Sequence, residues 1–596
     1  MRVLRVLLGV TAAFLPLAMW GISSGSAMMG GALYSRANEL LSSGRVSETP
    51  PGQSVAYEKS RVGTNVDQLS YWSTATPFLD LMKSSGDWLP QAPPGVWSTE
   101  EKLDLDENGW VRSLPTDGPL RHRSAGLVVL RGGDAGSAPP HARYVVLYDG
   151  EGVIDGMQGS RVVQREKSKQ RLLIEAADNG WLHISIRSTD PNHNGNYLRN
   201  IRIVREDLFP RFQRGEIFHP TFLKKASTFQ VIRFMNWMAT NKLIRPDGTE
   251  LVRRGREPYD LSASYLLNWS DRPRPSEALW TRGVPVEIMV ALANRSGADP
   301  WFNMPINASD DYLRGFANYV RTNLNPGRKI HVELSNEVWN LGYVQARYAE
   351  ARAKETFGPQ ASYIEWYGKR AAEMAAIWNS AFGEPPTGDT KKDRVRVVYG
   401  TQIVWKGRET PGLETPHWFD GKGKHRRAAD YFDEYAITGY YNFHIPAAEK
   451  LATVTNWWSD PDGGYNRALK SLSDGVRFEQ SPLYSYHAER SRQYGLALVT
   501  YESGYGELTP PNQHLNQRYT DFLVALQRRP EIYRVELANF EAFRRAGGSL
   551  FMNYGLIGKP TKYGSWSIFE SIDQPTSPRY EALLDMLQAA AARPTK

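Results

Sequence analysis

The sequence predicts an α/β protein built on a (β/α)8 TIM barrel, with a β-sandwich inserted into the barrel sequence. Short apolar runs alternate with segments of helical spacing from about residue 210 to the C-terminus. Two of the apolar runs end in a carboxylate, at Glu337 and Glu502. Between residues 88 and 207 the pattern changes to short alternating runs separated by turn residues, which is typical of a sandwich.

The N-terminus predicts an exported protein. Two arginines precede an apolar run over residues 6–22, and small residues follow up to Ala27. This pattern is typical of a signal peptide over residues 1–27, which places the protein outside the cell or in the periplasm. An uncleaved membrane anchor is the alternative, because the run is near the lower length limit for spanning a bilayer. After cleavage we expect no stable membrane insertion, and residues 28–60 are expected to form a linker.

The barrel is assigned to residues 61–87 and 208–592. Its strands are expected at residues 61–66, 229–237, 284–292, 330–334, 394–399, 435–441, 496–502 and 549–554. An aromatic loop, residues 301–305, is expected after the third strand. Helices are expected from residue 77, over 310–322, over 343–382 with a break near Gly358, and over 512–527, 531–546 and 580–591.

The inserted segment, residues 88–207, contains five runs with strand periodicity. They cover residues 126–130, 143–148, 171–175, 181–187 and 198–204. Turn signals such as Asp149-Gly150 separate them. Sandwiches of this size often bind carbohydrate, but a fold alone does not establish a function.

Composition excludes several classes of site. The chain has 596 residues and a net charge of +8, and its Lys and Arg residues form no long run. Nucleic-acid binding is therefore not expected, although a basic cleft for an acidic polysaccharide stays open. The chain contains no Cys, which excludes disulfides, a thiol nucleophile and thiolate metal sites. Scattered His residues and the absence of phosphate-loop or dinucleotide motifs predict no metal and no cofactor.

The two glutamates at strand ends suggest a reaction. Glycoside hydrolysis needs two carboxyl groups that flank one bond, one as proton donor and the other as nucleophile or base. The abundance of Trp and Tyr, 18 and 30 residues, suits sugar stacking, although large barrels also bury many aromatic rings. Glu507 and the Asp433-Glu434 pair are competing carboxylates, but neither lies as clearly at the end of an apolar run.

The Asn336-Glu337 pair on one strand and Glu502 on a later strand resemble the clan A retaining glycoside hydrolases. The resemblance covers roughly residues 60–90 and 210–590. It implies that Glu337 is the acid/base, that Glu502 is the nucleophile, and that Asn336 binds the 2-hydroxyl of the sugar. The exact family is left unassigned.

The same resemblance implies further substrate-site residues. Arg233 would hydrogen-bond the nucleophile, although a structural ion pair is an equal alternative. Either Tyr440 or Tyr441 would also bond the nucleophile, and Trp566 would form a platform under the sugar. Trp237 and Trp339 follow strand ends and are added as substrate-binding candidates.

The sequence therefore predicts an exported hydrolase that acts on a polysaccharide or oligosaccharide, with β-linkages favoured over α-linkages. A transglycosylase would use the same two glutamates and a sugar acceptor. A non-catalytic carbohydrate-binding protein is an alternative of a different class. The oligomeric state, the sugar and the linkage are left open.

Overall fold

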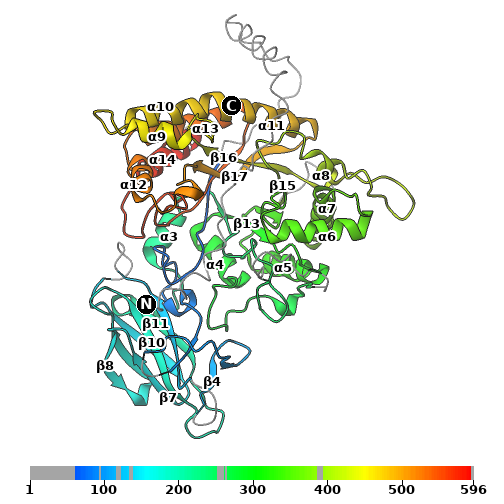
Figure 1. Cartoon of the computed structure of the whole chain (residues 1–596). Helices are drawn as coiled ribbons and strands as arrows, with labels where there is room; N and C mark the ends of the chain where they lie inside the picture. The colour runs from blue at the N-terminus through cyan, green and yellow to red at the C-terminus, as the bar shows by residue number, and fades with distance from the viewer. Residues whose placement is uncertain are drawn as a thin grey trace, which may run out of the picture. The chain divides into compact units, whose positions relative to one another are not determined.

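The structure, a computed structural model, describes residues 61–92, 95–115, 122–132, 139–251, 261, 265–385 and 394–591. The signal peptide and linker expected over residues 1–60 lie outside the described residues. Eight parallel strands close a barrel in chain order, and the last strand pairs with the first (Figure 1). The strands are β1 (Arg61–Asn65), β12 (Val231–Arg233), β13 (Asp299–Met304), β14 (Ile330–Leu334), β15 (Val395–Gly400), β16 (Glu434–Tyr441), β17 (Ala497–Tyr505) and β18 (Leu550–Asn553). The predicted barrel is confirmed.

The third barrel strand lies later in the sequence than predicted. Residues 284–292 were expected to form it, but the chain there enters helix α4 (Val286–Ser296), whose buried residues follow the helical spacing 286, 289, 290 and 293. The strand is β13, which lies where an aromatic loop was expected. A short apolar run does not distinguish a strand from a buried helix, and the prolines at positions 300 and 305 are unfavourable in a strand, so the sequence disfavours β13.

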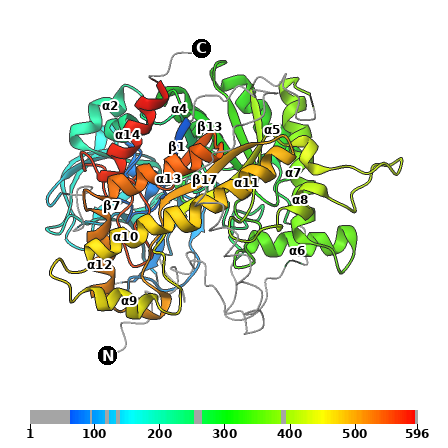
Figure 2. The same cartoon turned by 90° about the horizontal axis from the view of Figure 1, so that it is seen from above.

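The helices surround the barrel. The longer ones are α5 (Asp310–Asn323), α6 (Val344–Phe357), α7 (Tyr363–Phe382), α10 (Tyr465–Gly475), α11 (Ser481–Gln493), α12 (Gln517–Gln527), α13 (Ile532–Ala546) and α14 (Pro578–Ala591). Shorter ones are α2 (Phe209–Gln213), α3 (Pro220–Ala226), α8 (Thr410–Glu414) and α9 (Lys450–Trp457). The break near Gly358 is confirmed, whereas the helix expected from residue 77 is only a 3-10 turn, Leu81–Ser84. Helices α11 and α13 cover strands β16 and β17 (Figure 2).

Two antiparallel sheets lie between β1 and β12 in the sequence. One has the order β2 (Leu89–Gln91), β5 (Ser124–Leu130), β10 (Leu182–Thr189) and β7 (Gly152–Gly156). The other has the order β11 (Arg199–Arg205), β6 (Arg143–Asp149), β9 (Arg171–Glu175) and β8 (Arg161–Glu166). A small hairpin, β3 (Asp104–Leu105) and β4 (Val111–Ser113), precedes β5.

The two four-stranded sheets share one apolar core, as a sandwich requires. Leu127 and Ile184 from the first sheet lie in the same buried cluster as Tyr144 and Ile203 from the second. Strands β2, β7 and β8 add to the five that the sequence predicted. Residues Ser60–Lys596 form one compact unit, so the domain boundaries at residues 87/88 and 207/208 stay a prediction.

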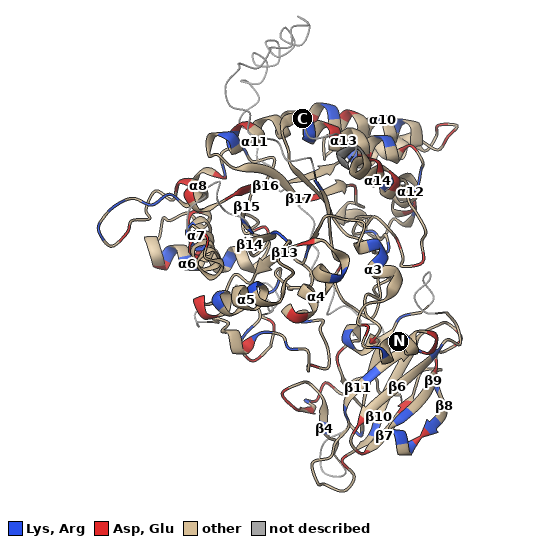
Figure 3. Cartoon of the chain, turned by 180° about the vertical axis from the view of Figure 1, so that it is seen from behind, with Lys and Arg blue, Asp and Glu red and all other residues tan. Residues whose placement is uncertain are grey.

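The barrel has two apolar layers, one inside and one outside the sheet. The inner layer is formed by Val231, Trp301, Val398, Ala436, Val499, Tyr501, Leu550 and Met552. A larger layer lies between the strands and the helices. Basic and acidic residues are interspersed along the elements (Figure 3), as the modest net charge suggests. Within the part of the chain that the structure describes, no helix is long and apolar enough to cross a membrane.

Candidate active site

Polar side chains gather where the barrel strands end. Asn65 is the last residue of β1, Arg233 the last of β12, and Tyr440 the penultimate residue of β16. Glu502 lies in the second half of β17, and Glu337 follows β14 by three residues. Because all eight strands are parallel, these side chains share the C-terminal face of the barrel, where barrel enzymes build their active sites.

Arg233 connects most of this group. Its Nη1 donates to Glu502 Oε1 at 2.9 Å and to Asn65 Oδ1 at 3.1 Å. Its Nη2 donates to Glu333 Oε2 at 2.9 Å and to Asn336 Oδ1 at 2.8 Å. The side chain is fully buried, so these partners replace the water that the guanidinium gives up. Arg233 thus forms a structural ion pair with Glu333 and also a hydrogen bond with Glu502. The sequence left these two roles open as alternatives, and in the structure Arg233 has both contacts.

Glu502 has a second donor, and it is Tyr440. The Tyr440 hydroxyl lies 2.9 Å from Glu502 Oε2. Tyr441 points to the other face of the strand, where its hydroxyl donates to Glu536 of α13. Successive side chains of a strand point to opposite faces, so only one of the two tyrosines can reach the interior. Tyr441 therefore contacts a helix on the outside of the barrel, and the expectation that it contacts a ligand does not fit its position.

Glu337 is held by different residues. Tyr501 donates its hydroxyl to Glu337 Oε1 at 3.0 Å, and Asn340 Nδ2 lies 3.4 Å from Oε2. Tyr501 directly precedes Glu502, yet both side chains reach the interior. A β-bulge explains this, because Ile437 pairs with Thr500 and Thr438 with Glu502, which leaves Tyr501 as an extra residue.

The backbone that carries Glu337 is strained. Ser335 has φ +61° and Glu337 has φ +44°, and neither is glycine. Left-handed conformations of this kind are costly for ordinary residues and occur preferentially at functional sites. The strain, together with the buried carboxylates, marks the segment after β14 as part of a built site.

Burial and the neighbouring carboxylate set the protonation of the pair. Burial, followed by repulsion from Glu502, raises the pKa of Glu337 to about 8. Burial also raises the pKa of Glu502, but Arg233 and the hydroxyl of Tyr440 oppose that rise. The cation contacts Glu502 and not Glu337, so we assign the negative charge to Glu502 and the proton to Glu337.

The remaining predicted residues differ in position. Asn336 Nδ2 donates to Asn241 at 2.9 Å, so its amide is held between Asn241 and Arg233. Trp566 is half-buried, and its ring meets Tyr440 edge-on at 5.1 Å, which places it beside Glu502. Trp339 is buried against the half-exposed ring of Trp405.

Trp237 lies away from this group. Its ring packs against Phe78, Phe222 and Phe234, and its indole N–H donates to the backbone oxygen of Asp67. The side chain is only 2% exposed. This position differs from the expected contact with substrate, because a large aromatic residue at a strand end can turn into the helix–sheet core.

Sequence reasoning missed Glu333, which is the other carboxylate on Arg233. Its Oε2 accepts from Arg233, from Trp301 Nε1 at 2.9 Å and from Asn303 Nδ2 at 2.7 Å. Strand β14 alternates apolar residues with His331 and Glu333, and polar residues at the inward positions of a buried strand were the available signal.

Asp67 was also missed, and it supports the segment that contains Trp566. Its carboxylate accepts from Ile557 N at 2.6 Å and from the Ser567 hydroxyl at 2.7 Å. Burial raises the pKa of Asp67 to about 7 despite these bonds. The interaction ties the chain after β1 to the chain after β18, on both sides of the barrel closure.

The competing carboxylates have other partners. Glu507 accepts from Lys450 and from the backbone of Phe443, so it forms a buried ion pair. Glu434 begins β16, at the opposite end of the barrel, and lies 2.7 Å from His331. Among the described residues, no three His, Cys, Asp or Glu side chains group as metal ligands.

Comparisons with known proteins place the chain in no family. No protein-family model and no curated protein matches the chain. Similar solved structures include a 4-O-α-L-rhamnosyl-β-D-glucuronidase from Fusarium oxysporum 12S, with 12% identity, 64% of this chain and 67% of that chain covered, and a TM-score of 0.35. A broad-specificity endoglucanase from Bacteroides salanitronis is 12% identical, and the match covers 62% of this chain and 84% of that chain with a TM-score of 0.30. An endo-β-1,4-mannanase from Thermotoga petrophila is 12% identical, and the match covers 63% of this chain and 74% of that chain with a TM-score of 0.31. Likeness at this level carries no argument about activity, which rests on the side chains described above.

Proposed function

We propose that the protein is an exported, retaining glycoside hydrolase that cleaves β-linked bonds of a polysaccharide. The observation that carries the proposal is the asymmetry of two buried carboxyl groups on the C-terminal face of the barrel. Glu502 contacts Arg233 and Tyr440, whereas Glu337 contacts Tyr501 and has a raised pKa. A charged carboxylate beside a protonated one is the arrangement that this reaction needs.

In the first step, Glu502 attacks the anomeric carbon while the bond from that carbon to the leaving oxygen breaks. Glu337 transfers its proton to the leaving oxygen, which departs as a free hydroxyl group. Arg233 and Tyr440 keep Glu502 ionised and oriented for attack. The product is a glycosyl ester of Glu502 together with an ionised Glu337.

In the second step, Glu337 removes a proton from water and the resulting nucleophile attacks the same anomeric carbon. The ester bond to Glu502 breaks, and both carboxyl groups return to their starting protonation states. Two displacements restore the configuration of the anomeric carbon. Asn336, which Arg233 and Asn241 hold in place, is proposed to bind the sugar 2-hydroxyl. The half-buried Trp566 is proposed to line the sugar site, whereas Trp339, only 3% exposed, would support it from beneath.

The test is hydrolysis of a panel of β-linked polysaccharides by the purified protein, with the anomer of the first product followed by NMR. We expect cleavage of at least one polymer with the β-anomer formed first. Release of the α-anomer first would contradict the retaining mechanism. Binding without cleavage, unchanged in Glu502→Gln, would favour the non-catalytic alternative, and products longer than the substrate would indicate transglycosylation.

A matched pair of tyrosine variants tests the division of roles. Tyr501→Phe removes a hydrogen bond that stabilises ionised Glu337, so the pKa of Glu337 should rise further above about 8. Tyr440→Phe removes a hydrogen bond that stabilises ionised Glu502, so the pKa of Glu502 should rise. In profiles of kcat/KM against pH, Tyr501→Phe should move the basic limb upward and Tyr440→Phe should move the acidic limb upward. Movement of the opposite limbs would reverse the roles of the two glutamates.

A further inference from the structure

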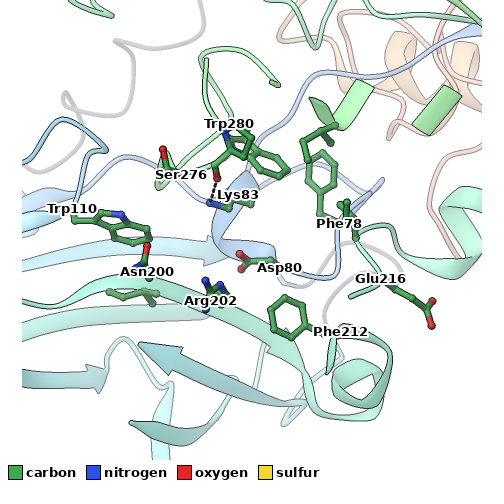
Figure 4. Close-up of a pocket in the computed structure, with 14 residues that line it drawn as sticks. Phe78, Asp80, Lys83, Trp110, Asn200, Arg202, Phe212, Glu216, Ser276 and Trp280 are labelled. Atoms are coloured by element: carbon green, nitrogen blue, oxygen red, sulfur yellow. Dashed lines mark hydrogen bonds between the residues drawn. The ribbon is translucent and has the colours of Figure 1, made fainter. Parts of the chain in front are cut away.

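A polar cavity lies away from the carboxyl pair, where the sandwich meets the barrel. Its volume is about 260 Å³, and its lining includes Asp80, Lys83 and Arg202 together with aromatic side chains (Figure 4). Asp80 and Lys83 come from the segment after β1, and Arg202 from strand β11 of the sandwich. Pockets for drug-sized ligands measure about 300–1,000 Å³, so this one suits a ligand near the size of one sugar ring.

The charged groups of the cavity are only partly used by the protein. Asp80 Oδ1 accepts from Met82 N at 3.2 Å and from Ile203 N at 3.0 Å. No described residue donates a hydrogen bond to its other oxygen, and none accepts one from the Arg202 guanidinium. Lys83 Nζ donates to the backbone oxygen of Glu277 at 2.6 Å and lies 3.4 Å from that of Pro275.

The charge of the cavity is positive. Lys83 and Arg202 outnumber Asp80, and the remaining acid of the lining, Glu216, is paired with Arg211 and Arg214. The lining thus offers one carboxylate acceptor and two cationic donors. A ligand that completes it needs hydroxyl groups for Asp80 and Lys83, and an anionic group for Arg202.

Aromatic rings complete the lining. Trp110 lies on one side of the polar group, and Phe78, Trp280 and Phe212 lie on the other side (Figure 4). Such rings pack against the apolar face of a pyranose while polar neighbours bond its hydroxyls.

We propose that this cavity binds a hexuronic acid unit, with the carboxylate of the sugar on Arg202 and its hydroxyls on Asp80 and Lys83. The site is distinct from the carboxyl pair of the barrel and does not depend on the proposed hydrolysis. It gives the sandwich-barrel junction a role in holding an acidic saccharide.

The test is isothermal titration of the full chain with D-glucuronate, D-glucose and acetate. We expect D-glucuronate to bind, D-glucose to bind at least about 10-fold more weakly because it lacks the charged group for Arg202, and acetate not to bind. Arg202→Gln should weaken glucuronate binding by a similar factor. Arg187→Gln, which changes an exposed arginine of β10 outside the cavity, and Glu502→Gln in the barrel should leave it unchanged.

Arg202 is exposed, so its replacement should not disturb folding, and the melting temperature of the variant checks this. Ser276→Tyr provides an independent variant that fills the cavity and should also abolish binding. The proposal is overturned if glucuronate does not bind, if acetate binds as tightly, or if binding survives both variants. Loss of binding in Glu502→Gln would place the sugar in the barrel site and would equally overturn it.

Discussion

Glu502→Ala is expected to lower kcat by about four to six orders of magnitude, the range found when one member of the catalytic triad is removed from another hydrolase. The physical reason is that no other carboxylate described here has the position and the charge of Glu502. Arg233 and Tyr440 would remain, oriented toward a cavity where the carboxylate had been. The measurement is the steady-state rate on whichever polymer the wild-type protein cleaves.

Added azide distinguishes the nucleophile from the acid/base. In Glu502→Ala, azide fits the space of the lost carboxylate and should form a glycosyl azide of inverted configuration in a single displacement. In Glu337→Ala, azide should instead attack the covalent intermediate and give a glycosyl azide of retained configuration. If the two products were exchanged, Glu337 would be the nucleophile and Glu502 the acid/base.

Glu507→Gln is a matched control for Glu502→Ala. Glu507 is a buried glutamate like Glu502, lies just after β17 and was a competing candidate. Its partners are Lys450 and the backbone of Phe443, so we expect turnover within about 10-fold of wild type after correction for stability. A loss as large as that of Glu502→Ala would contradict the assignment of the site.

The sequence predicted which strands carry the site residues, because a carboxylate at the end of an apolar run survives in a single sequence as a local pattern. Strand β14 matches its expected range, 330–334, and the strands of Glu502 and Tyr440 differ from expectation only at their ends. The barrel follows from this alternation, since parallel strands joined by helices bring their C-terminal ends together. Among the eight barrel strands only β13 was misplaced, because prolines disfavour a strand in its sequence and the apolar run of helix α4 was interpreted as the strand instead.

The faces of residues were harder to predict than their positions. The choice between Tyr440 and Tyr441 depends on strand register, and a one-residue shift exchanges the two faces. The bulge at Tyr501 breaks the alternation, so no periodic rule places Tyr501 and Glu502 on the same side. Glu333 was not predicted as a site residue because its role depends on hydrogen bonds from Arg233, Trp301 and Asn303. These residues are distant in sequence and lie next to Glu333 only in the folded barrel.

Glu337→Gln is expected to make the protein more stable at neutral pH while it removes the acid/base. The pKa of Glu337 is about 8 in the folded protein, against a usual value of 4.5. Between these values the unfolded chain releases a proton that the folded protein keeps, so the wild type loses stability as the pH rises toward 8. Each pKa unit corresponds to about 1.4 kcal/mol, which gives roughly 3 kcal/mol at pH 7.

The pH dependence of this difference separates titration from packing. Glutamine does not titrate, so the free energy of unfolding of Glu337→Gln minus that of wild type should be constant below about pH 4 and should grow by roughly 3 kcal/mol up to pH 7. A constant offset from altered bonds to Tyr501 and Asn340 does not change with pH and cancels in this comparison. Urea unfolding at several pH values from 4 to 7 measures this difference in the free energy of unfolding. The variant Glu489→Gln, at an exposed position, is the control, and its difference from wild type should not grow with pH.

A difference for Glu337→Gln that does not grow with pH would mean that Glu337 is ionised in the folded protein at neutral pH. The same carboxyl group could then not supply the proton for the leaving oxygen, so this equilibrium measurement tests the chemistry without any substrate.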